Sequence, residues 1–256
     1  MSSIAFKTLG GEGEDIVLIH GFGSDRLSWL GNSPALMTIG RVHALDLPGH
    51  GESDAEVADG SAGKLAEIVA DLLIKQGLVR FHLIGHSLGG AIALILAARQ
   101  PKIVSSLTLI APAGIGRGVD QSFAADYAAL DDLEAALTLM RRLVVRPQLI
   151  NKMTAQRVLA QLGRDGVRDA VRRIGAALPE SERQAQSAAL AVAVSDIPRS
   201  IIWGQQDAIN ALDDKRLQSF GGDAHVIPDT GHLPHIEDAK RVNGLLLEFL
   251  APLLPS

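Results

Sequence analysis

The sequence predicts an α/β protein with a mostly parallel, doubly wound sheet and a helical cap inserted between two of its strands. Short apolar runs alternate with amphipathic helical stretches up to residue 114 and again after residue 196. Between these parts, residues 115–196 show only helical spacing, and a connection this long must have structure of its own. We therefore expect a core made of 1–114 and 197–256, with the segment 115–196 as a cap over the carboxyl edge of the sheet.

Composition excludes several classes of protein. The chain has 256 residues, a formal net charge of −5 and no cysteine. There is thus no disulfide framework and no thiolate nucleophile, and neither metal nor cofactor is expected. The charge and the absence of a Lys/Arg cluster give no reason to expect nucleic acid. The N-terminus lacks a signal-peptide pattern, and the apolar tail at 245–250 is too short to span a bilayer, so we expect a cytoplasmic protein without membrane contact.

The first elements follow from the spacing of apolar residues and glycines. Ile4–Leu9 is expected to be a short edge strand. Asp15–His20 is a continuous apolar run typical of a strand buried on both faces of a parallel sheet. Trp29 and Leu30 are expected to start a helix that packs on the sheet. Arg41–Leu47 is the next buried strand, followed by a loop rich in turn residues.

Three further elements complete the first part of the core. The stretch 62–76 is an amphipathic helix closed by Gly77. Phe81–Ile84 reads as a strand that feeds a glycine-rich turn, and a strong helix former begins at Ala91. Val104–Ile110 is a further strand.

The segment 115–196 carries apolar stripes at helical spacing, among them Phe123, Tyr127 and Met140. Most apolar positions there must pack the cap, but we expect one or two of these three side chains to face the substrate. After the cap, Ser200–Gly204 resumes the sheet and 224–227 is its last strand. The final helix is expected from about Ile236 to Leu250.

The stretch Gly85–Gly89 has the form Gly-x-Ser-x-Gly between a strand and a helix, which is the context of a nucleophile elbow. Its glycines allow a tight turn that exposes the hydroxyl of Ser87 at the end of the strand. A serine hydroxyl is a weak nucleophile, so the chemistry requires a base and an orienting acid. The backbone N–H of Leu88 would stabilise developing negative charge, together with the N–H of Phe22.

Polar residues at the ends of later strands provide candidates for the base and the acid. Ser87, Asp207 and His232 occur in the chain order of the elbow-type triad. His232 can take the serine proton and return it to the leaving group, and Asp207 can orient the imidazolium. The rival acids are Asp213 and Asp214, which fall in a helical stretch, and Asp229, on the histidine's own strand end.

Three other histidines lie close to these motifs in the sequence. His86 precedes Ser87, but we expect the turn to direct its side chain away. His20 is expected to hydrogen-bond within its own loop. His235 follows Pro234 and is expected to open the last helix.

Taken together, the motifs resemble the α/β-hydrolase superfamily with an inserted cap, on His20–Gly23, Asp46–Ser53, Gly85–Gly90, Trp203–Asp207 and Gly231–His232. A closer resemblance is to the hydrolase-like C-terminal domain of the acetoin dehydrogenase E2 component, a dihydrolipoamide acetyltransferase. It is carried by Pro34–Leu36, Leu107–Ala111 and Val242–Leu246. Complete chains of that family begin with a lipoyl domain, for which there is no room before Asp15, so we expect a free-standing hydrolase or a detached relative.

Our main prediction is a serine hydrolase that cleaves a small ester, thioester or related acyl substrate through an acyl-Ser87 intermediate, without a cofactor. An acyltransferase with a thiol acceptor is the alternative, and a hydrolase-fold binding protein without catalysis is a second. A carbon–carbon bond hydrolase or a perhydrolase stays open because such relatives share the triad. The scarcity of cations near the motif loops favours water, or a neutral thiol, over coenzyme A. The sequence does not indicate an oligomeric state.

Overall fold

The computed structural model describes residues 3–193 and 195–254, so positions 1–2, 194 and 255–256 of the expected core and cap lie outside the described residues. The strands of this part are β1 Phe6–Gly10, β2 Asp15–Ile19, β3 Arg41–Leu45, β4 Phe81–His86, β5 Val104–Ile110, β6 Arg199–Gly204 and β7 Asp223–Ile227. They form one seven-stranded sheet in the order β1-β3-β2-β4-β5-β6-β7. Only β1 is antiparallel to its neighbour; the pairs from β3 to β7 are parallel. The predicted fold class is confirmed.

Strand β4 lies at the centre of the sheet and carries the glycine-rich turn at its end. All six of its residues are buried, as expected of a strand covered on both faces. Neighbouring strand β2 shows how the two faces divide: Val17 and Ile19 enter one apolar cluster, and Ile16 and Leu18 enter another. The sheet therefore has a core on each side.

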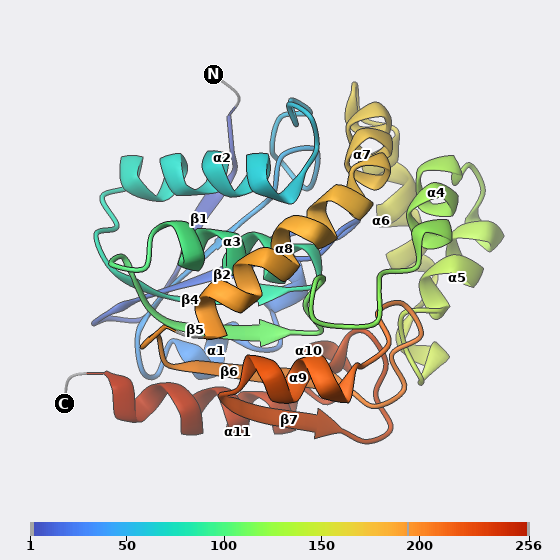
Figure 1. Ribbon diagram of the computed structural model, residues 1–256. Helices are drawn as coiled ribbons and strands as arrows, with labels where there is room; N and C mark the ends of the chain where they lie inside the picture. The colour runs from blue at the N-terminus through green and yellow to red at the C-terminus, as the bar shows by residue number, and fades with distance from the viewer. Residues whose placement is uncertain (1–2, 194, 255–256) are drawn as a thin grey trace.

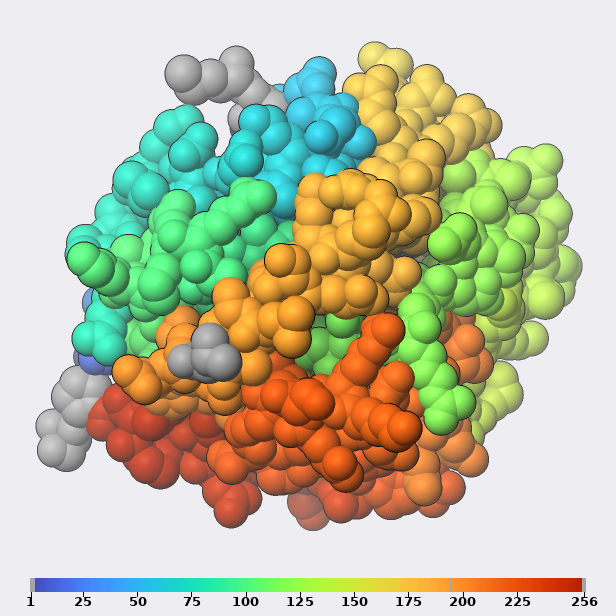
Figure 2. All heavy atoms as spheres, in the orientation of Figure 1, coloured from blue at the N-terminus to red at the C-terminus, as the bar shows by residue number. Residues whose placement is uncertain are grey.

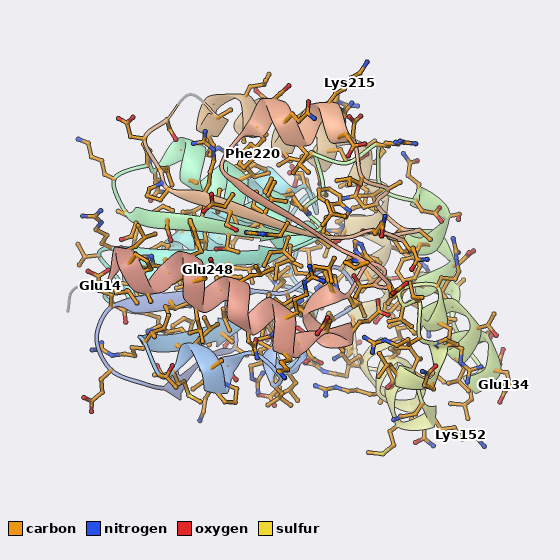
Figure 3. The ribbon with its side chains drawn as sticks, turned by 90° about the horizontal axis from the view of Figure 1, so that it is seen from below. Glu14, Glu134, Lys152, Lys215, Phe220 and Glu248 are labelled. Carbon is orange, nitrogen blue, oxygen red and sulfur yellow. The ribbon has the colours of Figure 1, made fainter. Side chains whose placement is uncertain are left out.

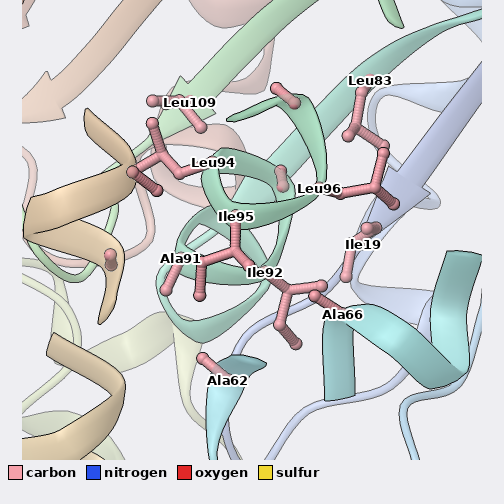
Figure 4. Packing of buried hydrophobic residues seen from close by; sticks show 14 of the residues in the cluster. Ile19, Ala62, Ala66, Leu83, Ala91, Ile92, Leu94, Ile95, Leu96 and Leu109 are labelled. Atoms are coloured by element: carbon pink, nitrogen blue, oxygen red, sulfur yellow. The ribbon is translucent and has the colours of Figure 1, made fainter. Parts of the chain in front are cut away.

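Helices cover both faces of the sheet (Figure 1). Those of the core are α1 Ser33–Leu36, α2 Ala62–Lys75, α3 Leu88–Arg99, α8 Leu178–Ala193, α9 Asp214–Phe220, α10 Pro234–Glu237 and α11 Ala239–Leu250, with 3-10 turns η1 Arg26–Trp29 and η3 Ala251–Leu253. Side chains of α2, α3 and α8 share one cluster, and those of η1, α1 and α11 share the other. Helix α3 is buried from Leu88 to Ala97, since it lies between the sheet, α2 and α8 (Figure 4).

The remaining helices lie beyond the carboxyl ends of the strands, on the right of Figure 1. They are α4 Gln121–Ala129, α5 Leu133–Arg141, α6 Lys152–Leu162 and α7 Val167–Ala176, with the 3-10 turn η2 Pro147–Leu149. Their apolar stripes form a separate cluster that includes Phe123, Met140 and Val158. The predicted helical insertion thus reaches the expected edge of the sheet.

Helix α8 differs from the expected division of the chain into a core and a cap. It lies in the segment 115–196, which was expected to form the cap, but it packs with the core. Ala185, Ala188 and Val192 join the cluster of α2 and α3. Figure 2 shows α8 between α3 and α9 on this face of the molecule. Its small residues allow close approach to α3, which periodicity alone does not reveal. We propose that the cap itself comprises α4 to α7.

Two expected helices differ in detail. The stretch at Trp29 is only a 3-10 turn, whose Trp29 is buried, whereas Leu30 is 63% exposed and does not pack on the sheet. The final helix is divided into α10 and α11 at Asp238, whose side chain accepts a hydrogen bond from the Arg241 N–H and caps α11. An Asp in that position offers the backbone an alternative to a continuous helix. Within the described residues, no helix is both long and apolar enough to cross a membrane.

Candidate active site

The turn between β4 and α3 holds Ser87 in a backbone conformation that few residues adopt. Ser87 has φ 52° and ψ −114°. A Cβ on Gly85 would lie 2.4 Å from the carbonyl oxygen of Gly89, and one on Gly89 would lie 2.4 Å from that of His20. Only glycine fits at both places, which is the steric reason for the Gly-x-Ser-x-Gly pattern. The turn is tied to β5 by the Ser87 N–H, which donates to Ile110 O at 2.9 Å.

His232 and Asp207 come to Ser87 from the ends of two neighbouring strands. The Nε2 of His232 lies 3.0 Å from the Ser87 Oγ, and its Nδ1 lies 2.8 Å from the Asp207 Oδ2. The other carboxylate oxygen of Asp207 accepts the N–H groups of Ile209 and Asn210, both at 2.9 Å. All three side chains are at least 94% buried. Because an ionised carboxylate only accepts, the proton of His232 lies on Nδ1, and Nε2 is free to accept from the Ser87 hydroxyl.

The rival acids lie elsewhere. Asp213 caps α9, where its side chain accepts the N–H groups of Lys215 and Arg216. Asp214 begins that helix and is exposed. Asp229 is exposed in the loop after β7, with a left-handed φ of 56°. None of these carboxylates has a hydrogen bond to His232.

The side chain of His86 lies closer to the site than its position in the sequence suggests. Its ring packs 4.9 Å from that of His232 and 4.6 Å from that of His235, measured between centroids. Its Nε2–H donates to the His232 carbonyl oxygen at 2.9 Å. Burial, followed by the neighbouring histidines, holds the pKa of His86 well below its usual value. His86 therefore stays neutral, and it holds His232 in place through ring packing and the hydrogen bond to its carbonyl oxygen.

Two neutral histidines fix the loop that carries Phe22. His20 Nδ1–H donates to Gly21 O at 2.8 Å, as the sequence predicted, and its Nε2 accepts the Leu47 N–H. The Nε2 of His50 accepts the Gly23 N–H at 3.0 Å. Burial lowers the pKa of both His20 and His50 to about 4, so both rings keep an acceptor nitrogen at neutral pH.

A cavity of about 560 Å³ lies between this site and the cap. Ser87 and His232 line it, together with Phe22 and Leu88. Its cap side is largely apolar and includes Phe123, Met140, Leu143, Ile150 and Val158. Such a cavity suits a small apolar ligand.

Of Phe123, Tyr127 and Met140, one or two of which were expected to face the substrate, Tyr127 is not part of the cavity wall. Its hydroxyl donates to Gly23 O at 2.9 Å, and its ring packs against Phe22 at 5.4 Å. Burial raises the pKa of Tyr127, so the hydroxyl remains a donor. Tyr127 thus packs against the loop that carries Phe22 and does not line the cavity, whereas Phe123 and Met140 do line it.

A polar group on the cavity wall was not anticipated from the sequence. The Oδ2 of Asp25 accepts the guanidinium of Arg157 at 2.6 Å and the amide of Gln161 at 2.7 Å. Asp25 is 132 positions from Arg157 and 136 positions from Gln161 in the sequence, and no local pattern links them. The ion pair joins α6 of the cap to the turn η1 of the core. Among the described residues, no cluster of three or more potential metal ligands is present.

The order of strands, elbow and cap places this chain in the class of α/β hydrolases. The chain belongs to the alpha/beta hydrolase family, whose sequence model it matches over residues 16–245. It is 37% identical over 243 residues to the dihydrolipoyllysine-residue acetyltransferase component of an acetoin cleaving system from Pseudomonas putida. That match covers 94% of this chain and 65% of the relative, so the chain spans just under two thirds of its length. The resemblance to the α/β-hydrolase superfamily is confirmed, and so is the closer resemblance to the acetoin dehydrogenase E2 component.

Other similar proteins are named as hydrolases. The chain is 30% identical over 263 residues to a 2-hydroxy-6-oxononadienedioate/2-hydroxy-6-oxononatrienedioate hydrolase from Burkholderia vietnamiensis, with 96% of this chain and 90% of that one covered. Among solved structures, a meta-cleavage product hydrolase from Pseudomonas fluorescens superimposes with a TM-score of 0.84 at 22% identity. That superposition covers 97% of this chain and 94% of the other, and it establishes a shared fold.

Proposed function

We propose that this protein is a serine hydrolase that cleaves a small ester, thioester or related acyl substrate through an acyl-Ser87 intermediate. The observation that carries the proposal is the 3.0 Å contact between Ser87 Oγ and His232 Nε2, with Asp207 at 2.8 Å from the other ring nitrogen. Ser87 Oγ attacks the acyl carbon as its proton passes to His232 Nε2. The imidazolium, stabilised by Asp207, then returns this proton to the leaving group.

The second half of the reaction uses the same residues. His232 takes a proton from water, the resulting hydroxide attacks the acyl carbon, and the acid leaves as the proton returns to Ser87 Oγ. In both halves, negative charge develops on the acyl oxygen. We assign its stabilisation to the backbone N–H of Leu88, which begins α3, and to that of Phe22, in the loop held by His20 and His50.

The cavity favours a neutral acyl group over an anionic one. Its cap side presents Phe123, Met140 and Leu143. Among the described residues that line it, Arg157 is the only permanent cation, and its guanidinium is engaged by Asp25. An anionic substrate would have to compete with that carboxylate.

Labelling with a fluorophosphonate probe tests the proposed nucleophile. The probe is expected to modify Ser87, located by mass spectrometry, and the reaction requires a neutral His232 imidazole, which alone can take the serine proton. Ser87→Ala should abolish labelling and lower the turnover of acyl esters by several orders of magnitude. Labelling that persists in this variant would contradict the assignment, and a wild-type protein that neither labels nor turns over esters would favour a binding protein.

Acyl transfer to a thiol is a second candidate, favoured by the Pseudomonas putida relative, whose name describes an acetyltransferase component. Both reactions share the acyl-Ser87 intermediate and differ in what attacks it. The intermediate can be formed from an activated acetate ester and offered increasing dihydrolipoamide or coenzyme A. Acetate as the main product at millimolar thiol supports the hydrolase, whereas acetyl-thiol as the main product supports the transferase.

A further inference from the structure

The backbone of His232 is held by bonds from outside its own loop. The residues 228–233 connect β7 to α10 without regular structure. The His232 N–H donates to Leu143 O of the cap at 2.8 Å, and its carbonyl accepts from His86 at 2.9 Å. The preceding N–H, that of Gly231, donates to the carboxylate of Glu237 at 2.6 Å. The position of the imidazole therefore depends on these partners.

Glu237 joins the histidine loop to the cap. While its Oε1 accepts from Gly231, its Oε2 accepts the N–H groups of Val145 at 2.9 Å and Arg146 at 3.3 Å. The guanidinium of Arg146 also donates to the Glu237 backbone oxygen. Glu237 is only 6% exposed, so its charge depends on these donors in place of water.

We propose that Glu237 is a positioning residue that sets His232 against Ser87 and couples it to the cap segment 143–146. The inference rests on the proposed role of His232 as the base. Leu143 completes the link, because this residue lines the cavity while its carbonyl oxygen accepts the His232 N–H. An acyl group packed against Leu143 thus touches the residue that holds the base.

The geometry of Gly231 reinforces this link. A Cβ at that position would lie 2.8 Å from Leu143 O and 3.2 Å from the Glu237 Oε1. The loop 228–233 is therefore in direct contact with the cap segment 143–146. The carboxylate of Glu237, on α10, is hydrogen-bonded to both. A shift of about 1 Å in a reacting group can cost on the order of 10²-fold in rate.

The substitution Glu237→Gln removes the charge and preserves the length of the side chain. An amide has one acceptor oxygen, so its NH₂ must face either Gly231 or the pair Val145 and Arg146, and one arm of the bridge is lost. Glu237→Asp keeps the charge but is too short to span both loops. Glu248→Gln is the matched control, since Glu248 is exposed on α11, toward the end of the molecule opposite Glu134 and Lys152 of the cap (Figure 3).

The test is the rate of fluorophosphonate labelling of Ser87, followed from acid to alkaline pH, with proton NMR of the His232–Asp207 hydrogen bond. In Glu237→Gln, the plateau rate at high pH should fall on the order of 10²-fold, and the deshielded proton resonance should shift or broaden. Glu237→Asp should fall between this variant and wild type, and Glu248→Gln should match wild type. Melting temperatures identify any variant that is not folded at the assay temperature.

Wild-type labelling and an unchanged resonance in folded Glu237→Gln and Glu237→Asp would overturn the inference. A lower melting temperature with an unchanged plateau rate would do the same, because it would show a purely structural role. If Glu237→Gln does not fold, the inference is tested with Glu237→Asp, through the same labelling rate of Ser87 and the same proton resonance. Ser87→Ala separates this outcome from failure of the proposed function, since labelling that survives in that variant refutes the nucleophile itself.

Discussion

The Nε2 of His232 lies 3.0 Å from the Oγ of Ser87, although the two residues are 145 positions apart in the chain. Ser87 stands on the turn after β4, at the centre of the sheet, whereas His232 follows β7 at its edge. The loops after these strands converge because parallel strands deliver their carboxyl ends to the same side of the sheet. The same convergence brings Asp207, after β6, to the far side of the imidazole.

Replacing Asp207 with Asn should slow acylation of Ser87 by about 10⁴-fold. The Asn oxygen can still accept the N–H groups of Ile209 and Asn210, which turns its NH₂ toward His232 Nδ1. That nitrogen must then accept, so the proton moves to Nε2 and the ring cannot take the serine proton. The measurement is the labelling rate of Ser87, with circular dichroism to confirm the fold.

Asp229→Asn is the matched control for this prediction. Asp229 is exposed and has a left-handed φ, which Asn also tolerates. Its labelling rate should equal that of wild type. A severe loss in Asp229→Asn together with a mild one in Asp207→Asn would mean that the acid has been assigned to the wrong carboxylate.

Truncation of the cavity wall should change selectivity for acyl chain length. Phe123→Ala and Met140→Ala enlarge a cavity of about 560 Å³, so kcat/KM should shift toward longer acyl esters and change little for acetate esters. Tyr127→Phe should leave this selectivity unaltered, since Tyr127 lies behind the wall. It should instead lower the free energy of unfolding by about 1 kcal/mol, through loss of the hydrogen bond to Gly23 O. Equal losses on all esters in the two alanine variants would indicate core packing only.

Asp25→Asn should make the cavity more tolerant of anionic substrates. The change frees the guanidinium of Arg157, while the Asn oxygen can still accept the Leu27 N–H. The Arg157 side chain is 48% exposed, so the ion pair is worth at most about 1 kcal/mol, and the gain should not exceed about fivefold. The measurement is kcat/KM for a carboxylate-bearing ester relative to a neutral ester of equal length. In the double variant with Arg157→Gln the gain should disappear; a gain that persists would assign it to another group.

His235→Phe should make the protein less sensitive to acid. Burial, followed by the nearby His232, lowers the pKa of His235 to about 3, and neither of its ring nitrogens has a hydrogen-bond partner among the described residues. Below pH 6.5 the unfolded chain takes up a proton that the folded protein refuses. The contribution of His235 to the free energy of unfolding therefore falls by about 1.4 kcal/mol for each pH unit below 6.5.

At pH 5 this effect amounts to roughly 2 kcal/mol, which the phenylalanine variant should not lose. Phenylalanine also preserves a ring between Trp29 and His86. Urea unfolding of both proteins at pH 7 and pH 5 provides the comparison. Parallel losses of stability between the two pH values would contradict the low pKa of His235.

Local patterns in the sequence determined the strands, the elbow and the identity of the candidate triad. Continuous apolar runs ending in glycine or polar residues mark buried parallel strands, and the steric demand on Gly85 and Gly89 is confined to a few consecutive residues. The order Ser87, Asp207, His232 then follows from the polar residues that come after three of these strands, β4, β6 and β7. Each of these inferences rests on residues close together in the chain.

Only the tertiary structure decided which side chains meet from distant segments. Tyr127 and Phe123 belong to one helical stripe, yet Tyr127 packs behind Phe22 while Phe123 lines the cavity. Periodicity identifies the apolar face of a helix but does not say what covers each turn of it. The bridge from Glu237 to residues 143–146 and the ion pair from Asp25 to Arg157 each join segments more than 90 positions apart. Such contacts depend on how the cap is docked, which no local spacing specifies.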